Sequence, residues 1–209
     1  RENKTNMTSE EQLKACFTKI RSLNKKKDRI YEKAMEQLDE YGFHLVKYAD
    51  LTSKEDEKYL TMYFDRQILP LISPQVISKR QPFPFLNNGE LYIAAQLESK
   101  KGKRKLGIIS IVHTEDGRLI HLPSGAFILL EDVLFHFLPK IFAHQKVIKA
   151  SVIRVTRSAD IDEEEIEDHH DYRSMMESLI KQRRKLRPLR LEYTEGLDEL
   201  ELEMLAKFL

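Results

Sequence analysis

The feature that most constrains this fold is a proline-rich stretch between a helical pattern and an apolar one. Pro70 and Pro74 follow the helical pattern, and proline cannot continue an α-helix. The next prolines alternate with large apolar side chains in QPFPFL, residues 81–86. An exposed linker rarely carries two phenylalanines and a leucine in six residues. We therefore expect this stretch to lie against the protein, and the turn residues NNG after it to lead into a buried strand over residues 91–97.

Length, charge and cysteine content limit the class of protein. The 209 residues suffice for one domain with an appendage or for two small domains, and 41% of them are hydrophobic. Charged residues reach 33% but nearly cancel to a net charge of +1, so no global field favours DNA or an anionic membrane as a partner. The single cysteine, Cys16, fits a reducing compartment. No apolar run reaches the ~18–20 residues of a membrane span. We expect a cytoplasmic protein, with any membrane association arising through other parts of a longer chain.

The first 42 residues predict one long helix. Thr8 and Glu11 have the spacing of a capping box, and apolar residues then recur about every 3.5 positions up to Gly42, a residue suited to a helix C-terminus. Such a helix would have about 34 residues and a length of about 50 Å. Lysines 25–27 interrupt the apolar stripe, which favours a helix lying on other parts of the protein over an isolated coiled coil. These lysines form either a solvated turn or a phosphate contact, and we favour the solvated turn.

Short strands and helices alternate irregularly along the rest of the chain. A capping-box spacing at residues 52–55 predicts a helix that continues to Leu69, and residues 147–156 predict the central strand. Because the order is not a regular βαβ repeat, we predict an α+β fold in which a long N-terminal helix precedes a mostly antiparallel sheet with packed helices. The other predicted elements are strands at 43–46, 91–97, 108–112, 118–122 and 189–193, and helices at about 130–142, at 162–185 and after Gly196.

Opposite charges separate within the predicted helix at 162–185. Residues 160–171 contain eight acids and no base, and residues 181–187 contain five bases and no acid. Acids at the N-terminus and bases at the C-terminus both stabilise a helix through its dipole. His169 and His170 would point about 100° apart on this helix. We therefore favour packing and surface positions for them over a catalytic pair.

Basic residues provide candidates for contacts with phosphate or with another domain. Five of the six residues 100–105 are cationic and lie at the turn of a predicted hairpin, where they either bind a polyanion or keep the turn soluble; we favour the second interpretation. Arg154 and Arg157 flank a strand end and could contact phosphate or pair with the acidic start of the next helix. The candidate residues are Lys101, Lys103, Arg104, Arg154, Arg157, Arg183 and Arg184.

Common catalytic signatures are absent from the sequence. The seven glycines are scattered singly, so there is no Walker or dinucleotide loop, and no G-x-S-x-G, H-E-x-x-H or paired CxxC motif occurs. The protein-kinase combination of strand lysine, catalytic aspartate and metal-binding aspartate is also missing. His136 and His144 have no carboxylate or cysteine at metal-ligand spacing. Each absence removes a common enzyme class from consideration, and we favour structural or exposed positions for the two histidines.

Three groups of residues follow one another along the chain. The first runs from a helix ending in YF through ILPLISP to QPFPFLNN and an apolar strand; the others are ILLEDV at residues 128–133 and IRVTRSAD at residues 153–160. In sequence and order, these groups resemble the middle part of bacterial polyphosphate kinases. Over roughly residues 9–209 the chain resembles the last helix of the N-terminal domain followed by the middle, or head, domain. Ser158 stands where the family tends to have aspartate, and Gln81 where it tends to have a basic residue or histidine.

The resemblance implies that the chain is part of a longer phosphotransferase. Such enzymes reversibly transfer the terminal phosphate of ATP to polyphosphate, with Mg²⁺, through a phosphohistidine in C-terminal domains related to phospholipase D. Here residues 1–42 would end the N-terminal domain, residues 43–209 would form the middle domain, and the catalytic domains would be absent. His144 and Lys146 match the start of the H-x-K-x4-D pattern of those domains, but Ser151 replaces its aspartate.

The resemblance also implies the role of this part. It would contain no catalytic, cofactor-binding or metal-binding residue and would be inactive alone. It would serve packing and dimerisation within a homo-oligomer, with the remaining domains and polyphosphate as partners. An alternative needs no attached enzyme: the basic hairpin turn and basic residues 183–185 would also suit a polyanion-binding or protein-interaction module. Without the resemblance, the residues predict only an α+β domain with a long N-terminal helix.

Overall fold

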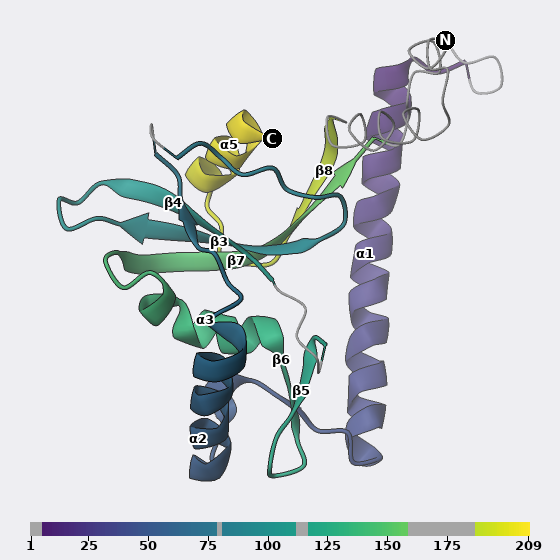
Figure 1. Ribbon diagram of the computed structural model, residues 1–209. Coiled ribbons are helices and arrows are strands. Elements are labelled where there is room, and N and C mark those ends of the chain that lie inside the picture. Colours follow the sequence, from purple (N-terminus) through teal and green to yellow (C-terminus); the bar gives the residue numbers. More distant parts are fainter. Residues whose placement is uncertain (1–5, 79–80, 112–116, 159–186) are drawn as a thin grey trace, which may run out of the picture.

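A computed structural model describes residues 6–78, 81–111, 117–158 and 187–209, which form an α+β domain with one long helix at its side (Figure 1). The predicted helix at 162–185, with His169, His170, Arg183 and Arg184, lies outside the described residues. The elements are α1 (Ser9–Glu40), β1 (Leu45–Val46), η1 (Tyr48–Asp50), α2 (Lys54–Tyr63), η2 (Phe64–Ile68), β2 (Gln75–Val76), β3 (Leu91–Glu98), β4 (Arg104–Ser110), β5 (Leu119–His121), β6 (Phe127–Leu129), α3 (Leu130–Ile141), β7 (Lys146–Arg157), β8 (Pro188–Tyr193) and α5 (Glu199–Phe208).

The main sheet has the strand order β2-β4-β3-β7-β8, and each neighbouring pair is antiparallel. This confirms the predicted α+β class and the predicted hairpin, which β3 and β4 form. The prediction that residues 147–156 form the central strand is wrong, because β3 is the middle strand and β7 lies beside it. The physical reason is burial: residues 92–97 of β3 are all buried, whereas several residues in the first half of β7 are exposed.

The two faces of the main sheet carry separate hydrophobic cores. Ile93, Ala95 and Leu97 point to one face, where they pack with residues of α2, η2 and α3. Tyr92 and Ala94 point to the other face, which α5 covers (Figure 1). This division follows from the alternation of side chains along a strand. Because each fully buried large apolar side chain contributes roughly 1.5–3 kcal/mol, both covers are needed to stabilise the sheet.

The proline-rich stretch forms part of the second core, as the sequence predicts. Leu86 is fully buried there, and Phe83 stacks on Phe208 of α5 with ring centroids 5.2 Å apart. Gly89 has a φ of +77°, and its N–H donates to the carbonyl of Val155 at 2.9 Å. The stretch therefore covers the sheet and is fastened to β7 just before β3 begins.

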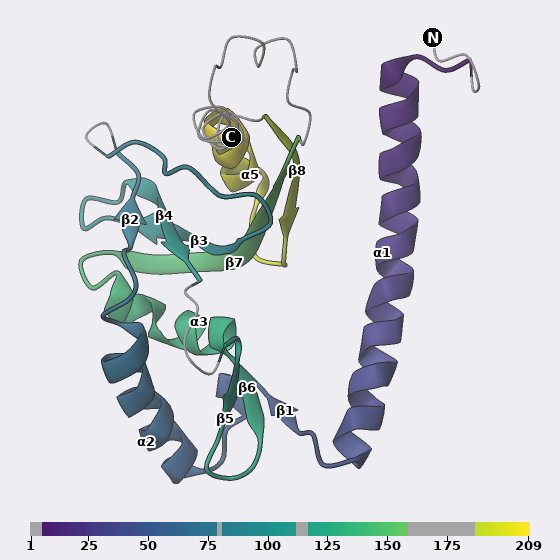
Figure 2. The same ribbon diagram turned by 45° about the vertical axis from the view of Figure 1, so that its right-hand side comes forward.

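Both predicted ends of α1 are confirmed. The Thr8 side chain accepts from the Glu11 N–H, and the Glu11 carboxylate accepts from the Thr8 N–H at 2.7 Å. At the C-terminal end Gly42 has a φ of +88°, which allows the Phe43 N–H to donate to the Leu38 carbonyl at 2.9 Å. The helix runs along one side of the main sheet (Figures 1 and 2), and it contains no fully buried residue.

The start of α2 differs from the prediction by one residue. The cap is Ser53, whose hydroxyl accepts from the Asp56 N–H, so the predicted capping box at residues 52–55 is wrong. Asp56 is only 3% exposed, and its carboxylate accepts from the Ser124 N–H at 3.0 Å. This long-range contact fixes the register of the helix start, and sequence spacing does not reveal it.

A second, smaller sheet has the order β1-β6-β5. β1 pairs parallel with β6, and β5 pairs antiparallel with it. Phe43, just before β1, stacks on Phe127 of β6 with centroids 4.5 Å apart. The predicted strand at residues 118–122 is thus observed as β5, but it joins this small sheet.

Gly107 of β4 provides a test of packing in the first core. A Cβ at this position would lie 2.7 Å from Phe142 Cζ and 2.8 Å from Leu97 Cδ1. Non-bonded carbon atoms do not approach one another so closely. Because these neighbours must shift, Gly107→Ala should lower the free energy of unfolding by about 1–3 kcal/mol in urea titrations. Ser110→Ala, at the exposed end of the same strand, is the control and should change it by less than about 0.5 kcal/mol. Equal stability of the two variants would contradict this packing.

Candidate functional site

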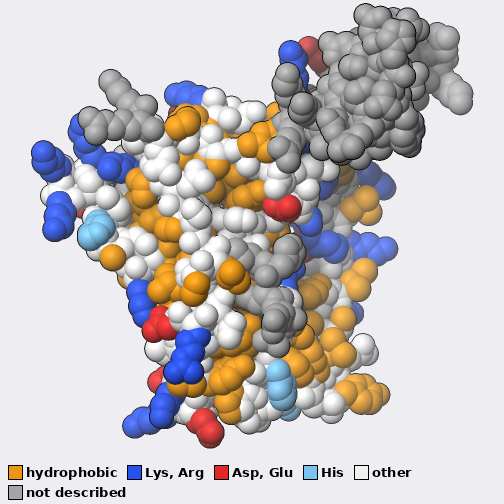
Figure 3. All heavy atoms as spheres, viewed as in Figure 1, with side chains coloured by type: hydrophobic (Ala, Val, Ile, Leu, Met, Phe, Trp, Pro, Cys, Tyr) orange, Lys and Arg blue, Asp and Glu red, His pale blue; other side chains and the backbone are white. Residues whose placement is uncertain are grey.

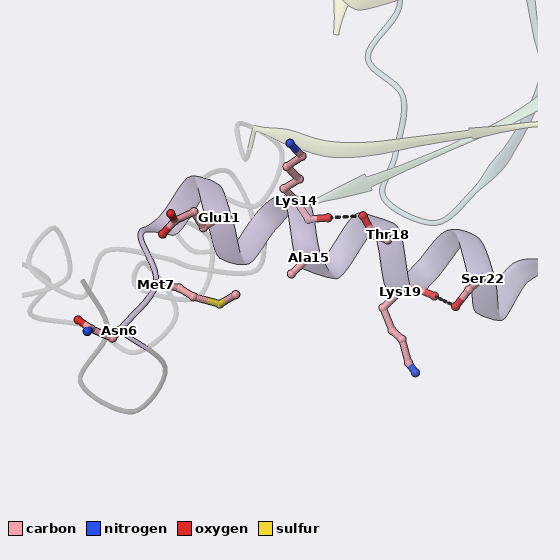
Figure 4. A pocket seen from close by; sticks show the side chains of 8 residues that line it. All are labelled: Asn6, Met7, Glu11, Lys14, Ala15, Thr18, Lys19 and Ser22. Carbon is pink, nitrogen blue, oxygen red and sulfur yellow. Dashed lines mark hydrogen bonds between the residues drawn. The ribbon is translucent and has the colours of Figure 1, made fainter.

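A hollow of about 720 Å³ lies beside the N-terminal part of α1, up to Ser22, and its side chains do not converge (Figure 4). The Thr18 hydroxyl donates to the Lys14 carbonyl, and the Ser22 hydroxyl donates to the Lys19 carbonyl. Figure 4 shows the ammonium groups of Lys14 and Lys19 extending to opposite sides of the helix. Because its hydroxyls are already used and its cations point apart, this hollow is a poor candidate for a site.

A second hollow, of about 850 Å³, lies between α1 and the edge of the main sheet formed by β7 and β8. We call it the α1–sheet groove. Its charged lining residues are Arg21, Lys27 and Asp28 of α1, Arg118, Arg154 of β7, Arg190 and Glu192 of β8, and Glu195. A neighbouring hollow of about 440 Å³ shares Leu91, Arg118 and Arg154 with the groove. Cationic side chains from several parts of the chain thus meet at one edge of the sheet.

Strand register explains why charged residues of β7 and β8 meet in the groove. Arg154 is the direct cross-strand partner of Glu192, and Arg190 lies two residues before Glu192 in β8. Since alternate residues of a strand share a face, the three side chains project from the same face of the sheet. The adjacent residues Ile153 and Val155 project to the opposite face and pack in the second core.

Two guanidinium groups share one carboxylate oxygen. Glu192 Oε2 lies 3.0 Å from Arg154 Nε and 3.0 Å from Arg190 Nη2. These contacts, with the hydrogen bond from Arg154 as the largest cause, lower the pKa of the Glu192 carboxyl. One carboxylate neutralises only one of the two cations, so the cluster keeps a positive charge. Arg190 Nε is buried and has no acceptor among the described residues.

Arg118 is held by a different carboxylate. Its Nε donates to both carboxylate oxygens of Glu131, at 2.8 and 3.0 Å, and its Nη2 also contacts Glu131 Oε1. The hydrogen bond to Glu131 raises the pKa of the guanidinium. Glu131 is only 7% exposed at the start of α3, whereas the Arg118 side chain is more than half exposed. This ion pair anchors Arg118 with part of its side chain in the groove.

Arg157 lies apart from Arg154, although the sequence pairs them as candidates. Its guanidinium carbon lies 4.1 Å from the centroid of the Phe85 ring, and its Nε donates to the Leu86 carbonyl at 2.9 Å. Burial lowers the pKa of Arg157. Because side chains alternate along a strand, Arg157 shares the face of Ile153 and Val155, opposite to that of Arg154. Arg157 therefore contacts the proline-rich stretch, and Arg154 lines the groove.

The basic hairpin turn is where the sequence predicts it. Lys101 and Lys103 are exposed in the turn between β3 and β4, and Arg104 is the exposed first residue of β4. Figure 3 shows Lys and Arg side chains gathered at the left of the molecule, where Figure 1 places this turn. Within the described part of the chain, none of the three forms an ion pair with a carboxylate. The turn and the groove are separate basic surfaces.

The histidines with predicted roles differ in their surroundings. His136 stacks on Tyr48 with ring centroids 3.5 Å apart, and burial lowers its pKa. His144 is exposed beside the end of α3. In the residues that the structure describes, no group of three or more His, Cys, Asp or Glu could hold a metal ion. Over the same residues, no helix combines the length and apolar character needed to span a membrane.

Sequence reasoning identifies Arg154 but misses Arg118, Arg190 and Glu192. The alternation of Arg190 and Glu192 along a strand is a local signal that could have placed both on one face. Arg118 has no such signal, because its position depends on a buried partner, Glu131, in another element. The sequence also does not predict that α1 lines the groove, since this depends on where the long helix lies relative to the sheet.

Comparison with known proteins agrees with the fold and the motifs. Residues 55–209 match the family model described as polyphosphate kinase middle domain. Polyphosphate kinases of Exiguobacterium sibiricum and Bacillus anthracis are 32% and 33% identical to the chain, of which the alignments cover 91% and 100%. They cover only 27% and 31% of those relatives, so the chain spans less than a third of their length.

A solved structure supports the same fold. The crystal structure of polyphosphate kinase from Porphyromonas gingivalis matches with a TM-score of 0.71 at 22% sequence identity, over 94% of this chain and 28% of that chain. Fold and sequence together define an α+β domain of the kind found within larger phosphotransferases. The chain belongs to the polyphosphate kinase middle-domain family. The resemblance seen in the sequence is thereby confirmed; the boundary between residues 42 and 43 stays a prediction.

The shared carboxylate predicts a pH dependence. Because the folded-state pKa of Glu192 is lowered, its ion pairs stabilise the fold above the usual glutamate pKa of about 4.3, and this contribution is lost as pH falls through the lowered value. Glu192→Gln should lower the free energy of unfolding by about 0.5–1 kcal/mol at neutral pH and much less in acid. Urea unfolding across this pH range measures the difference. Glu203→Gln, at an exposed position of α5, is the control; the same pH profile for both variants would contradict the assignment.

Proposed function

We propose that this chain is the middle part of an enzyme that reversibly transfers the terminal phosphate of ATP to polyphosphate. The observation that carries the proposal is the family match over residues 55–209, together with relatives named polyphosphate kinase that align over nearly the whole chain. ATP and Mg²⁺ serve the whole enzyme in this proposal, and neither is assigned to a residue of this chain. The proposed location is the cytoplasm.

The proposed reaction passes the phosphate through a histidine outside this chain. The described histidines offer support, because several are held in structural contacts: His44 bonds to Asp39, His121 lies against Phe127 and His136 stacks on Tyr48. A nucleophilic histidine needs an accessible ring nitrogen next to a bound phosphate. The groove presents guanidinium and carboxylate groups, which suit binding and ion pairing rather than nucleophilic attack.

The proposed role of the chain itself is to pack against the catalytic domains and to help dimerise the enzyme. The unburied stripe of α1 supports this role, because large apolar side chains along a helix normally pack against something. Its exposed members are Leu13, Leu23, Ile30, Tyr31 and Leu38. Under this proposal the partners are the remaining domains, polyphosphate and a second copy of the enzyme.

Phosphate transfer from labelled ATP tests the proposal. The isolated chain, incubated with γ-labelled ATP and Mg²⁺, should acquire no acid-labile label, because its nucleophile is missing. A longer gene product that contains the chain should become labelled on histidine and should form labelled polyphosphate. Acid-labile label on the isolated chain would overturn the assignment of the nucleophile. A longer product that is soluble and folded but forms no polyphosphate would overturn the reaction itself.

A second candidate function is polyanion binding by the hairpin turn. The exposed cations of Lys101, Lys103 and Arg104 favour it, since none has a carboxylate partner in the described residues. Clustered cations bind a polyanion by releasing its counterions, so the affinity falls steeply with salt.

Retention on immobilised long-chain polyphosphate tests this second function. The unchanged chain should be retained and should elute with salt, and a triple variant with glutamine at Lys101, Lys103 and Arg104 should elute at clearly lower salt. A variant with glutamine at Lys14, Lys19 and Lys33, which are exposed on α1, loses the same three charges and is the control for net charge. If both variants elute alike, the turn has no specific role.

A further inference from the structure

The α1–sheet groove has an excess of cations over anions. Five cationic and three anionic side chains line it. Lys27 pairs with Asp28 at 3.2 Å, and Arg154 and Arg190 share Glu192. Most surface cations are solvated singly, but here two guanidinium groups converge on one oxygen inside a hollow. An anion that entered the groove would meet both groups at once.

The guanidinium groups keep unused donors. Arg154 bonds to Glu192 through Nε alone, and neither of its Nη atoms hydrogen-bonds to another described residue. Arg190 contacts Glu192 through Nη2, and its buried Nε has no acceptor among those residues. A guanidinium presents five N–H donors in a rigid planar fork that matches the oxygens of phosphate or carboxylate. The groove therefore offers several fixed donors to an anion with many oxygens.

The shape of the hollow favours an extended ligand. The groove of about 850 Å³ and its neighbour of about 440 Å³ share Arg118 and Arg154, so these two cations line both hollows; Glu90 is the anion of the smaller one. Volumes of this order are typical of ligand sites. Apolar side chains such as Phe17 and Ile20 form part of the wall, and they reduce the screening of charges by water. A linear anion with repeated charges fits such a lining better than one compact ion.

We propose that the α1–sheet groove binds a short run of phosphate groups in a linear inorganic phosphate chain, with Arg154 and Arg190 as the central contacts and Arg118 beside them. The choice of phosphate rests on the proposed function, and the site is distinct from the hairpin turn. Glu192 occupies one donor of each central arginine when the groove is empty. The Glu192 carboxylate holds the two guanidinium groups in position, and it also competes with an incoming anion for their N–H donors.

Titration calorimetry with tripolyphosphate tests the site in the isolated chain. The unchanged chain should bind one tripolyphosphate in preference to orthophosphate or sulfate, because only the longer anion can extend beyond the two convergent guanidinium groups towards Arg118. Combined Arg154→Gln and Arg190→Gln should weaken binding by about 10-fold or more, since two charge-assisted contacts are lost. The slope of log affinity against log salt should also become shallower by about two. Glu192→Gln should tighten binding by about 3-fold, because it removes the competing charge.

The hairpin variant with glutamine at Lys101, Lys103 and Arg104 is the matched control and should bind tripolyphosphate as the unchanged chain does. Circular dichroism checks that each variant is folded. If the double arginine variant does not fold, Arg154→Lys replaces it. This variant should still weaken binding, because lysine keeps the charge but lacks the planar set of N–H donors of a guanidinium group. Equal affinity for sulfate, unchanged affinity in the folded arginine variant, or loss of binding only in the hairpin variant would each overturn the proposal. Failure of phosphate transfer in the longer product would leave this binding result unaffected, so the two proposals fail separately.

Discussion

The structure depends on the burial of β3 on both faces. Residues 92–97 are all buried, and a strand of this kind folds only if each face of the sheet has its own cover. One face of the sheet is covered by α2, η2 and α3, and the other face is covered by α5 and the proline-rich stretch. The prolines contribute by stopping the preceding helix and by holding the chain extended across the sheet, where Leu86 reaches the core. Loss of either cover would expose half of the central strand to water.

The charged features are consequences of that sheet. Since the even-numbered and odd-numbered residues of β7 face opposite sides, Ile153 and Val155 are drawn into the second core and Arg154 is turned towards the groove. The pairing of β7 with β8 then sets Arg154 opposite Glu192, with Arg190 beside it. The same packing that stabilises the domain thus concentrates guanidinium groups at one edge of the sheet, next to α1. Arg157, an odd-numbered residue, faces the side of Ile153 and Val155 and contacts Phe85 of the proline-rich stretch.

Membership in the polyphosphate kinase middle-domain family gives these features a context. The chain covers only about three tenths of relatives such as that of Bacillus anthracis. Among the described elements, α1 is the one long helix, and it has exposed apolar residues and no fully buried one.

The sequence alone determined the elements whose signals are local. The capping box of α1, the glycine that ends it, the hairpin of β3 and β4 and the buried linker all follow from residues close to one another in the chain, where hydrogen bonds and steric limits act directly. Only the tertiary structure decided which strand is central, that β5 joins a separate small sheet, and that Ser53 caps α2. It also decided that Arg118, Arg190 and Glu192 meet Arg154 in one groove. These outcomes depend on contacts between residues far apart in the chain, such as Asp56 with Ser124 and Arg118 with Glu131, and neither propensity nor spacing carries information about such contacts.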